Sequence, residues 1–462
     1  ADVSFLPHRL HPPNSSIPMK SRLLPMFQAL ALGVLLSSCA NYATVKEKRI
    51  SFHPITGTIK TLGDIERGIA GALNIRKKDP TEALAGCIAA AASASEQLAK
   101  TPGDHVVRDE YNFAVARIFN AINDGSIDPW TQPLVLPADR GGWVLTHKSD
   151  ARKEWNPALY DLRPADQFDI GGIYVKERHV KQGLGAPLVA RGRNANSDAR
   201  KDFALPRIYY GVTAVARFTG KRCEISFLDP LATETVSLTG RTFPLAADFT
   251  VPIAVMLAET NPMKLDLKRL LNPDKYAETA RIARLQPYDP DKTVVLVVHG
   301  LNSSPGTWAP MINALRMNET IRRNYQFWFY SYPSGYPYPH SAAILRKELD
   351  AVEKRFPLKK KMIVIGHSMG GCISRLLITD VGDKLWTGFF GKEPGQVKIS
   401  AESKQLFQDA LIFNQRADID RVVFIAAPLR GADMASGWMG RLGSKLVKSP
   451  MTLMKAGAEM LK

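Results

Sequence analysis

A serine between two glycines has the setting that most clearly predicts chemistry in this sequence. The segment GHSMGG places Ser368 between Gly366 and Gly370, with the apolar run MIVI before it and CISRLLI after it. This context predicts a strand, a tight turn and a helix, with the serine hydroxyl exposed on a strained turn. Both glycines are needed because a Cβ there would collide with the neighbouring strand or helix. We therefore expect Ser368 to be a catalytic nucleophile.

A second segment, VHGLN, also follows an apolar run. Gly300 lets the backbone turn sharply, so that the N–H of Leu301 can face the serine. Together with the N–H of Met369, it would form a two-donor oxyanion hole. We interpret His299 as a support of this loop and His367 as a support of the nucleophile turn, rather than as the catalytic base.

Strands and helices alternate around these motifs. We expect strands at 293–298, 325–330, 362–365 and 421–427, and helices at 310–316, 342–356 and 372–380. The first strand, TVVLVV, is an unbroken β-branched run, typical of a strand buried on both faces. The alternation predicts an α/β fold with a mostly parallel sheet, whose ligands bind beyond the carboxyl ends of the strands. Both motifs follow such ends.

These segments resemble the α/β-hydrolase superfamily, and within it the lipase and esterase group. In chain order, HGLNSSPGTW, YQFWFYSYPSGYP, GHSMGG and FIAAPLRGAD are similar to the triacylglycerol-lipase and GPI-inositol-deacylase-like branch, over residues 288–433. The resemblance implies an α/β-hydrolase domain with Ser368 as nucleophile, Leu301 and Met369 as oxyanion donors, and no cofactor.

The resemblance fails at the catalytic base. The family's triad follows the order Ser, Asp or Glu, His, but none of the nine histidines follows Ser368. A serine without a base is a poor nucleophile at neutral pH. We expect the hydrolase domain at 286–462 to be C-terminally incomplete, with acid and histidine beyond Lys462, and this chain to have little activity by itself. His340 and Asp433 are weaker candidates for base and acid.

The N-terminal region is typical of an exported bacterial lipoprotein. Residues 19–38 contain a short basic segment and an apolar stretch too short to span a bilayer, as in a secretory signal. The sequence LSSC ends at Cys39 and resembles a lipobox, which implies lipid attachment there and a location in the bacterial cell envelope, on the periplasmic face of the outer membrane or the cell surface. We interpret 1–18 as upstream read-through and 39–61 as a tether.

Three further segments complete the expected organisation. Residues 62–127 contain apolar residues at helical spacing and predict a helical hairpin. Residues 128–285 predict a β-containing accessory domain with a hairpin turn at 219–221, although this hairpin could instead provide the first strands of the following sheet. Residues 383–420 form an insertion that could be a lid.

Composition narrows the classes of function. Sixty-one Lys and Arg against 44 Asp and Glu leave a net charge of +17. The basic residues are scattered and no nucleic-acid motif accompanies them, so we expect attraction to an anionic membrane and no nucleic-acid partner. Four widely spaced cysteines provide neither a zinc site nor a disulfide scaffold, and we expect no metal. The sequence predicts a membrane-anchored serine hydrolase of carboxylic or lipid esters; the alternative is a catalytically inactive hydrolase-fold lipoprotein, a binding scaffold on the envelope.

Overall fold

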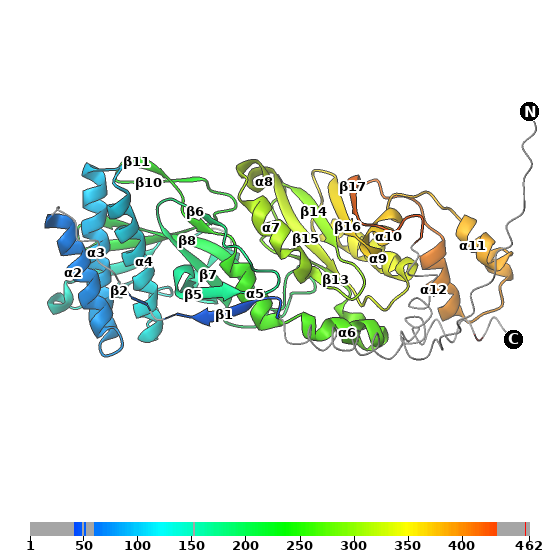
Figure 1. Cartoon of the computed structure of the whole chain (residues 1–462), viewed down its shortest axis with the longest axis horizontal. Helices are drawn as coiled ribbons and strands as arrows, with labels where there is room; N and C mark the ends of the chain where they lie inside the picture. Colours follow the sequence, from blue (N-terminus) through cyan, green and yellow to red (C-terminus); the bar gives the residue numbers. More distant parts are fainter. Residues whose placement is uncertain (1–40, 49, 52–59, 151–152, 432–457, 459–462) are drawn as a thin grey trace, which may run out of the picture. The chain divides into compact units, whose positions relative to one another are not determined.

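The computed structural model of the chain describes residues 41–48, 50–51, 60–150, 153–431 and 458. The described residues from Tyr42 onward belong to one compact unit, a mixed α/β fold with a six-stranded and a five-stranded sheet (Figure 1). The expected read-through segment 1–18, the signal segment 19–38, Cys39 and Asp433 lie outside the described residues.

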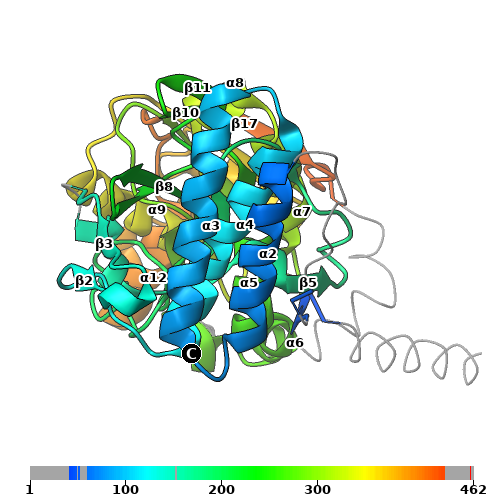
Figure 2. The same cartoon turned by 90° about the vertical axis from the view of Figure 1, so that its left-hand side faces the viewer.

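Three helices lie between residues 60 and 124, where the sequence predicts a hairpin of two. They are α2 (Lys60–Ile75), α3 (Pro80–Lys100) and α4 (His105–Asp124), and Figure 2 shows them next to one another. Asp79 caps α3 by accepting from the N–H of Glu82, and Asp104 caps α4 in the same way. The predicted helical pair is present, and the expectation of two helices is wrong because α2 packs on α3 as a third.

The six-stranded sheet lies in the region where we expect a β-containing domain. Its strands, in spatial order, are β2 (Leu134–Val135), β3 (Val144–His147), β9 (Arg222–Leu228), β8 (Tyr209–Thr219), β7 (Ala186–Gly192) and β4 (Tyr160–Pro164). The hairpin β8–β9 is confirmed, with Thr219 paired to Arg222 around Gly220 at φ 56°. Its alternative place in the following sheet is wrong, because both strands are interior to this one.

Three short antiparallel pairs surround this sheet: β1 (Thr44–Glu47) with β5 (Phe168–Gly171), β6 (Val180–Lys181) with β12 (Ala247–Asp248), and β10 (Thr235–Leu238) with β11 (Arg241–Pro244). Helices α3 and α4 share one hydrophobic core with the sheet, in which Leu84, Ile88 and Ile118 join Leu145 and Val212. The helices and the β-rich region are therefore one packing unit rather than two.

The five-stranded sheet has the order β13 (Arg281–Arg284), β15 (Tyr325–Ser331), β14 (Thr293–Val298), β16 (Met362–His367) and β17 (Ile419–Ile425). Strands β14 to β17 are parallel, and β13 is antiparallel to β15. The four strands predicted from the sequence are confirmed. Strand β13 is not predicted, because its sequence RIAR is polar; Arg284 is nevertheless buried and donates to the carbonyls of Asp202 and Gln286.

Helices cover both faces of this sheet. Side chains of β14 alternate: Val295 and Val297 pack with α7 (Ala309–Arg316), and Leu296 and Val298 with α9 (Tyr338–Arg355) and α10 (Met369–Arg375). The remaining helices are α5 (Val251–Thr260), α6 (Met263–Leu271), α8 (Glu319–Asn324), α11 (Lys384–Phe390) and α12 (Ala401–Leu411). In the part of the chain that the structure describes, no helix combines the length and apolarity needed to cross a bilayer.

Candidate active site

Ser368 occupies the turn between β16 and α10, as the sequence predicts. Its backbone has φ 53° and ψ −124°, a conformation that is costly for a residue with a side chain. The turn is held on both sides, since the Ser368 N–H donates to the carbonyl of Ile425 and its carbonyl accepts from the N–H of Gly371, each at 2.9 Å. The half-buried serine is thus fixed at the carboxyl end of β16.

The two glycines of the motif are required by close approach. A Cβ on Gly370 would overlap the carbonyl oxygens of Val298 and His299 at the end of β14. A Cβ on Gly366 would lie 2.6 Å from the carbonyl oxygen of Gly370. Both collisions expected from the sequence are therefore present, with the next strand for Gly370 and with α10 for Gly366.

The loop after β14 lies directly against the serine. In the parallel register Val298 is beside Gly366, and a Cβ on Gly300 would be 3.0 Å from the Cβ of Ser368. Leu301 follows with its side chain 54% exposed. Met369 is the first residue of α10, so its N–H has no partner within the helix. The backbones of the two expected oxyanion donors therefore flank the serine.

His299 is completely buried beneath this loop. Its Nδ1 is 2.9 Å from the carbonyl oxygen of Gly300, which can only accept, so Nδ1 carries the proton. Its Nε2 accepts, at 3.4 Å, from the N–H of Tyr332, whose ring stacks on the imidazole and whose hydroxyl donates to the His299 carbonyl at 2.7 Å. Burial lowers the pKa of His299 to about 3. The imidazole is thus neutral, with both nitrogens occupied, and supports the loop.

The other two histidines near these elements have different surroundings. The exposed ring of His367 meets Trp308 edge-on, with centroids 6.4 Å apart. His340, on α9, packs edge-on against Tyr336, and burial lowers the pKa of its imidazole. Among the described residues, no hydrogen bond joins an imidazole to the hydroxyl of Ser368.

Sequence reasoning did not identify the contacts that hold the loop after β14 in place. Asn302, at φ 49°, donates its N–H to the buried hydroxyl of Ser334 at 3.0 Å. Tyr332 and Ser334 follow β15, which ends at the same edge of the sheet as β14 and β16. Their position after a strand end is the signal that could have identified them. Ala427, after β17, lies where a Cβ on Gly371 would be and so encloses the start of α10.

The expected lid insertion contains α11 and α12. Its aromatic side chains pack mainly on one another: Trp386 stacks on Phe390 with centroids 4.3 Å apart, and Phe407 contacts both Phe389 and Phe390. Helix α12 packs against α9. The exposed face of Phe389 is apolar surface, and a lid role for residues 383–420 stays a prediction.

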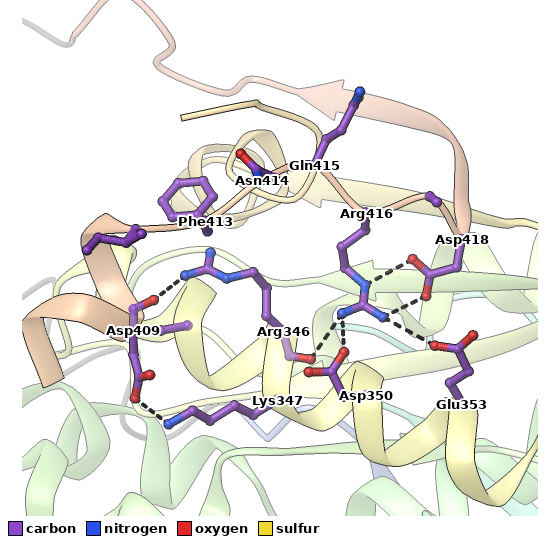
Figure 3. A pocket seen from close by; sticks show the side chains of 13 residues that line it. Arg346, Lys347, Asp350, Glu353, Asp409, Phe413, Asn414, Gln415, Arg416 and Asp418 are labelled. Carbon is purple, nitrogen blue, oxygen red and sulfur yellow. Dashed lines mark hydrogen bonds and ion pairs between the residues drawn. The ribbon is translucent and has the colours of Figure 1, made fainter. Parts of the chain in front are cut away.

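A polar cavity of about 480 Å³ lies between α9 and the segment before β17 (Figure 3). Arg416 pairs there with Asp350 at 2.6 Å and with Asp418 at 2.9 Å, and Lys347 pairs with Asp409. None of the predicted site residues lines this cavity. Because the charged side chains of this cavity pair largely with one another, we interpret them as ion pairs that stabilise the packing of α9 against the segment before β17.

Comparisons of the chain with family models, with curated proteins and with solved structures found no match. Within the described ranges, no three His, Cys, Asp or Glu side chains are arranged to hold a metal ion. The geometry around Ser368 is therefore what bears on function.

Proposed function

We propose that this chain is a serine hydrolase of the α/β-hydrolase class that cleaves carboxylic esters through an acyl-enzyme on Ser368. The observation that carries the proposal is the serine's backbone at φ 53° and ψ −124°, in a strand-to-helix turn against Gly300. A residue in such a sparsely populated conformation costs about 1–3 kcal/mol and persists only where its surroundings enforce it. A Gly-x-Ser-x-Gly sequence of no functional consequence would not need that strain.

The proposed reaction begins with attack of the Ser368 hydroxyl oxygen on the ester carbonyl carbon. The negative charge that develops on the carbonyl oxygen is stabilised by the N–H groups of Leu301 and Met369. Each such donor typically contributes about 2.7–4 kcal/mol to transition-state stabilisation. Collapse of the intermediate expels the alcohol and leaves the acyl group on Ser368, and water then releases the acid.

The reaction also requires a group that accepts the serine proton. His299 cannot serve, because both ring nitrogens are bonded and burial lowers the pKa of the imidazole to about 3. No imidazole of the described residues is bonded to the Ser368 hydroxyl. The proposed machinery therefore has a nucleophile and an oxyanion site, and lacks a base among the described residues.

We extend the proposal to location and substrate. Lipid attachment at Cys39 would hold the hydrolase on the bacterial envelope, and the net charge of +17 would favour an anionic membrane. Esters of membrane lipids are then the substrates nearest to the site. The alternative from the sequence is an inactive binding scaffold, and the following experiment distinguishes it from the hydrolase.

Because the described residues provide no base for Ser368, imidazole rescue is the sharpest test. Hydrolysis of p-nitrophenyl butyrate by the 462-residue chain is measured with 0 to 200 mM imidazole, a range on the order of that used to saturate a weak site. Imidazole hydrolyses the ester by itself, so the rate with Ser368→Ala is subtracted. We expect a difference that rises with imidazole. For the control Ser237→Ala, which alters an exposed serine of β10 in the other region, we expect an unchanged difference.

Equal rates for the parent chain and Ser368→Ala at every imidazole concentration, in proteins with matching circular dichroism spectra and thermal unfolding, would contradict the proposal and favour the scaffold.

A further inference from the structure

A second cavity lies away from the Ser368 hydroxyl, where helices α5 and α6 meet the five-stranded sheet. Its volume of about 430 Å³ is within the range of about 300–1,000 Å³ found for small-molecule sites. Aliphatic side chains form most of its wall, among them Ile253 and Leu257 of α5, Leu265 of α6 and Ile312 of α7. None of Gly300, Leu301, Ser368 and Met369 lines it.

Two arginines interrupt this apolar wall. The largely buried Arg269 has an Nε with no hydrogen-bond partner, and no ion pair joins its guanidinium to another described residue. Asp266 acts on it only at a distance, and the hydroxyl of Tyr42 donates to that carboxyl. Arg281 uses one N–H on the carbonyl of Ala204. The acidic side chain at the cavity, Glu278, is exposed.

A guanidinium in an apolar cavity is a costly arrangement without an anion. Burial of a charge is unfavourable unless the charge is paired and hydrogen-bonded. Burial here lowers the pKa of Arg269, while a planar guanidinium is suited to two parallel hydrogen bonds with a carboxylate or phosphate. The cavity thus combines an apolar volume with an available anion receptor.

We propose that this cavity binds a single-chain anionic amphiphile, with the alkyl chain between α5, α6 and α7 and the carboxylate or phosphate head accepting hydrogen bonds from Arg269. This ligand site does not rest on the hydrolase proposal, since it uses none of the residues assigned to the reaction. The two head groups share one chemistry, an anionic oxygen group at the end of one chain.

Binding is measured by isothermal titration calorimetry of the 462-residue chain with dodecanoate, dodecyl phosphate and dodecanol, below the aggregation limit of each. We expect saturable one-site binding of the two anions that is stronger than that of dodecanol. From octanoate to dodecanoate, each added CH₂ should tighten binding about fourfold while the chain still fits. The tighter of the two anions identifies the preferred head group.

Three variants separate the parts of the site. Arg269→Leu should weaken binding of both anions about tenfold to a hundredfold and leave dodecanol unchanged. Leu265→Trp should weaken all three ligands by filling the cavity, while Arg323→Leu, which removes an exposed arginine of α8, should weaken none. Ser368→Ala should also bind normally, so that a failed hydrolase proposal leaves this result standing.

Thermal unfolding of each variant verifies its fold. Removal of the unpaired Arg269 charge should not lower the Tm, so weak binding by this variant cannot be attributed to unfolding. The proposal is overturned if no anion binds saturably to the parent chain, or if a folded Arg269→Leu binds dodecanoate and dodecyl phosphate as tightly as the parent. The first result would mean that the cavity binds no anionic amphiphile, and the second that Arg269 does not bind the head group.

Discussion

The two large sheets of this chain differ in where they hold costly backbone conformations. In the five-stranded sheet, strands β14, β16 and β17 are followed by Asn302 at φ 49°, Ser368 at 53° and Ala426 at 47°. Around the six-stranded sheet, such angles are spread over separate loops: Ser126 after α4 at φ 50°, Phe203 between β7 and β8 at 48°, and Thr239 in the β10–β11 turn at 49°. Strain gathered at one edge of a sheet is typical of functional sites, and here it surrounds one serine.

The sheets also differ in what their buried polar groups do. In the first, polar groups join helix α4 to the β-rich region. The hydroxyl of Tyr111 donates to the Ala216 carbonyl at 2.6 Å and accepts from its N–H at 2.9 Å, and Asn120 donates to Gln167 at 2.7 Å. In the second, His299 and Ser334 bond to the loop that lies against Ser368. The first set of contacts stabilises the core between the helices and the six-stranded sheet. The second set positions the loop beside the candidate nucleophile.

The largest effect should come from filling the space beside the strained turn. Gly370→Ala forces a Cβ into the carbonyl oxygens of Val298 and His299. We expect a loss of about 3 kcal/mol or more in the free energy of unfolding, since backbone atoms cannot move aside as a flexible side chain could. Urea unfolding followed by circular dichroism measures it.

The matched control for this change lies in the other region. A Cβ on Gly71, in the interior of α2, would meet nothing within 4 Å. Gly71→Ala should raise the unfolding free energy by about 0.5–1 kcal/mol, because alanine loses less backbone entropy in a helix. Equal losses for the two variants would contradict the close approach at Gly370.

A smaller loss is expected where a polar group only fastens the core. Tyr111→Phe leaves the N–H and the carbonyl of Ala216 without their buried partner, at a cost of about 1–3 kcal/mol. The same urea titration measures this loss. Tyr111 lies in the region of the six-stranded sheet, so the Ser368-dependent rate in imidazole should be unaltered. A loss of that rate in folded Tyr111→Phe would contradict the view that this region stabilises the core and does not position Ser368.

His299 should make the free energy of unfolding depend on pH below about 6.5. Its pKa is about 3 in the folded chain, below the unfolded value of about 6.5, so the unfolded chain binds the proton more readily in between. The contribution of the neutral His299 imidazole to the free energy of unfolding is complete above pH 6.5 and is lost as pH falls toward 3. At pH 5 the parent chain should have lost about 2 kcal/mol more than His299→Gln, relative to pH 7. Parallel stability curves would contradict a neutral, buried imidazole.

The smallest effect, of the opposite sign, is expected in the helical region. Burial beside Glu66 and Asp109 raises the pKa of Glu110 to about 7. The folded chain therefore holds this proton more tightly, and stability falls as pH rises from about 4.5 through 7. Glu110→Gln should gain about 1 kcal/mol relative to the parent between pH 5 and pH 8, after allowance for solvent screening. A gain that does not change with pH would contradict the raised pKa.

The fold was predictable from sequence where patterning is strong and local. The β-branched run of β14 and the Gly-Lys turn of the β8–β9 hairpin identify those elements directly. Strand β13 was not predictable in the same way, because Arg284 is buried through contacts with Glu154 and Asp202, which lie far away in the sequence. Helix α10 ends at Arg375, earlier than predicted, because Leu376, Leu377 and Ile378 donate to carbonyls three residues back and tighten the turn.

In the candidate site, too, the residues of a local motif were predictable, and the residues brought in by tertiary contacts were not. Ser368, Gly366, Gly370 and Gly300 were predictable because a short motif specifies a local turn. The anchors Tyr332 and Ser334 belong to another strand end, and only the parallel register of β14 and β15 brings them to the loop. Sequence alone also does not show that both nitrogens of His299 are occupied, which depends on tertiary contacts.

The most direct test of the account is to find where a reactive phosphonate binds the chain. The 462-residue protein is incubated with a fluorophosphonate probe and imidazole, digested, and analysed by mass spectrometry. The account predicts one adduct, on the peptide that contains Ser368, and its absence from Ser368→Ala but not from Ser237→Ala. An adduct on another serine, or none on a folded chain, would contradict the assignment of Ser368 as the nucleophile.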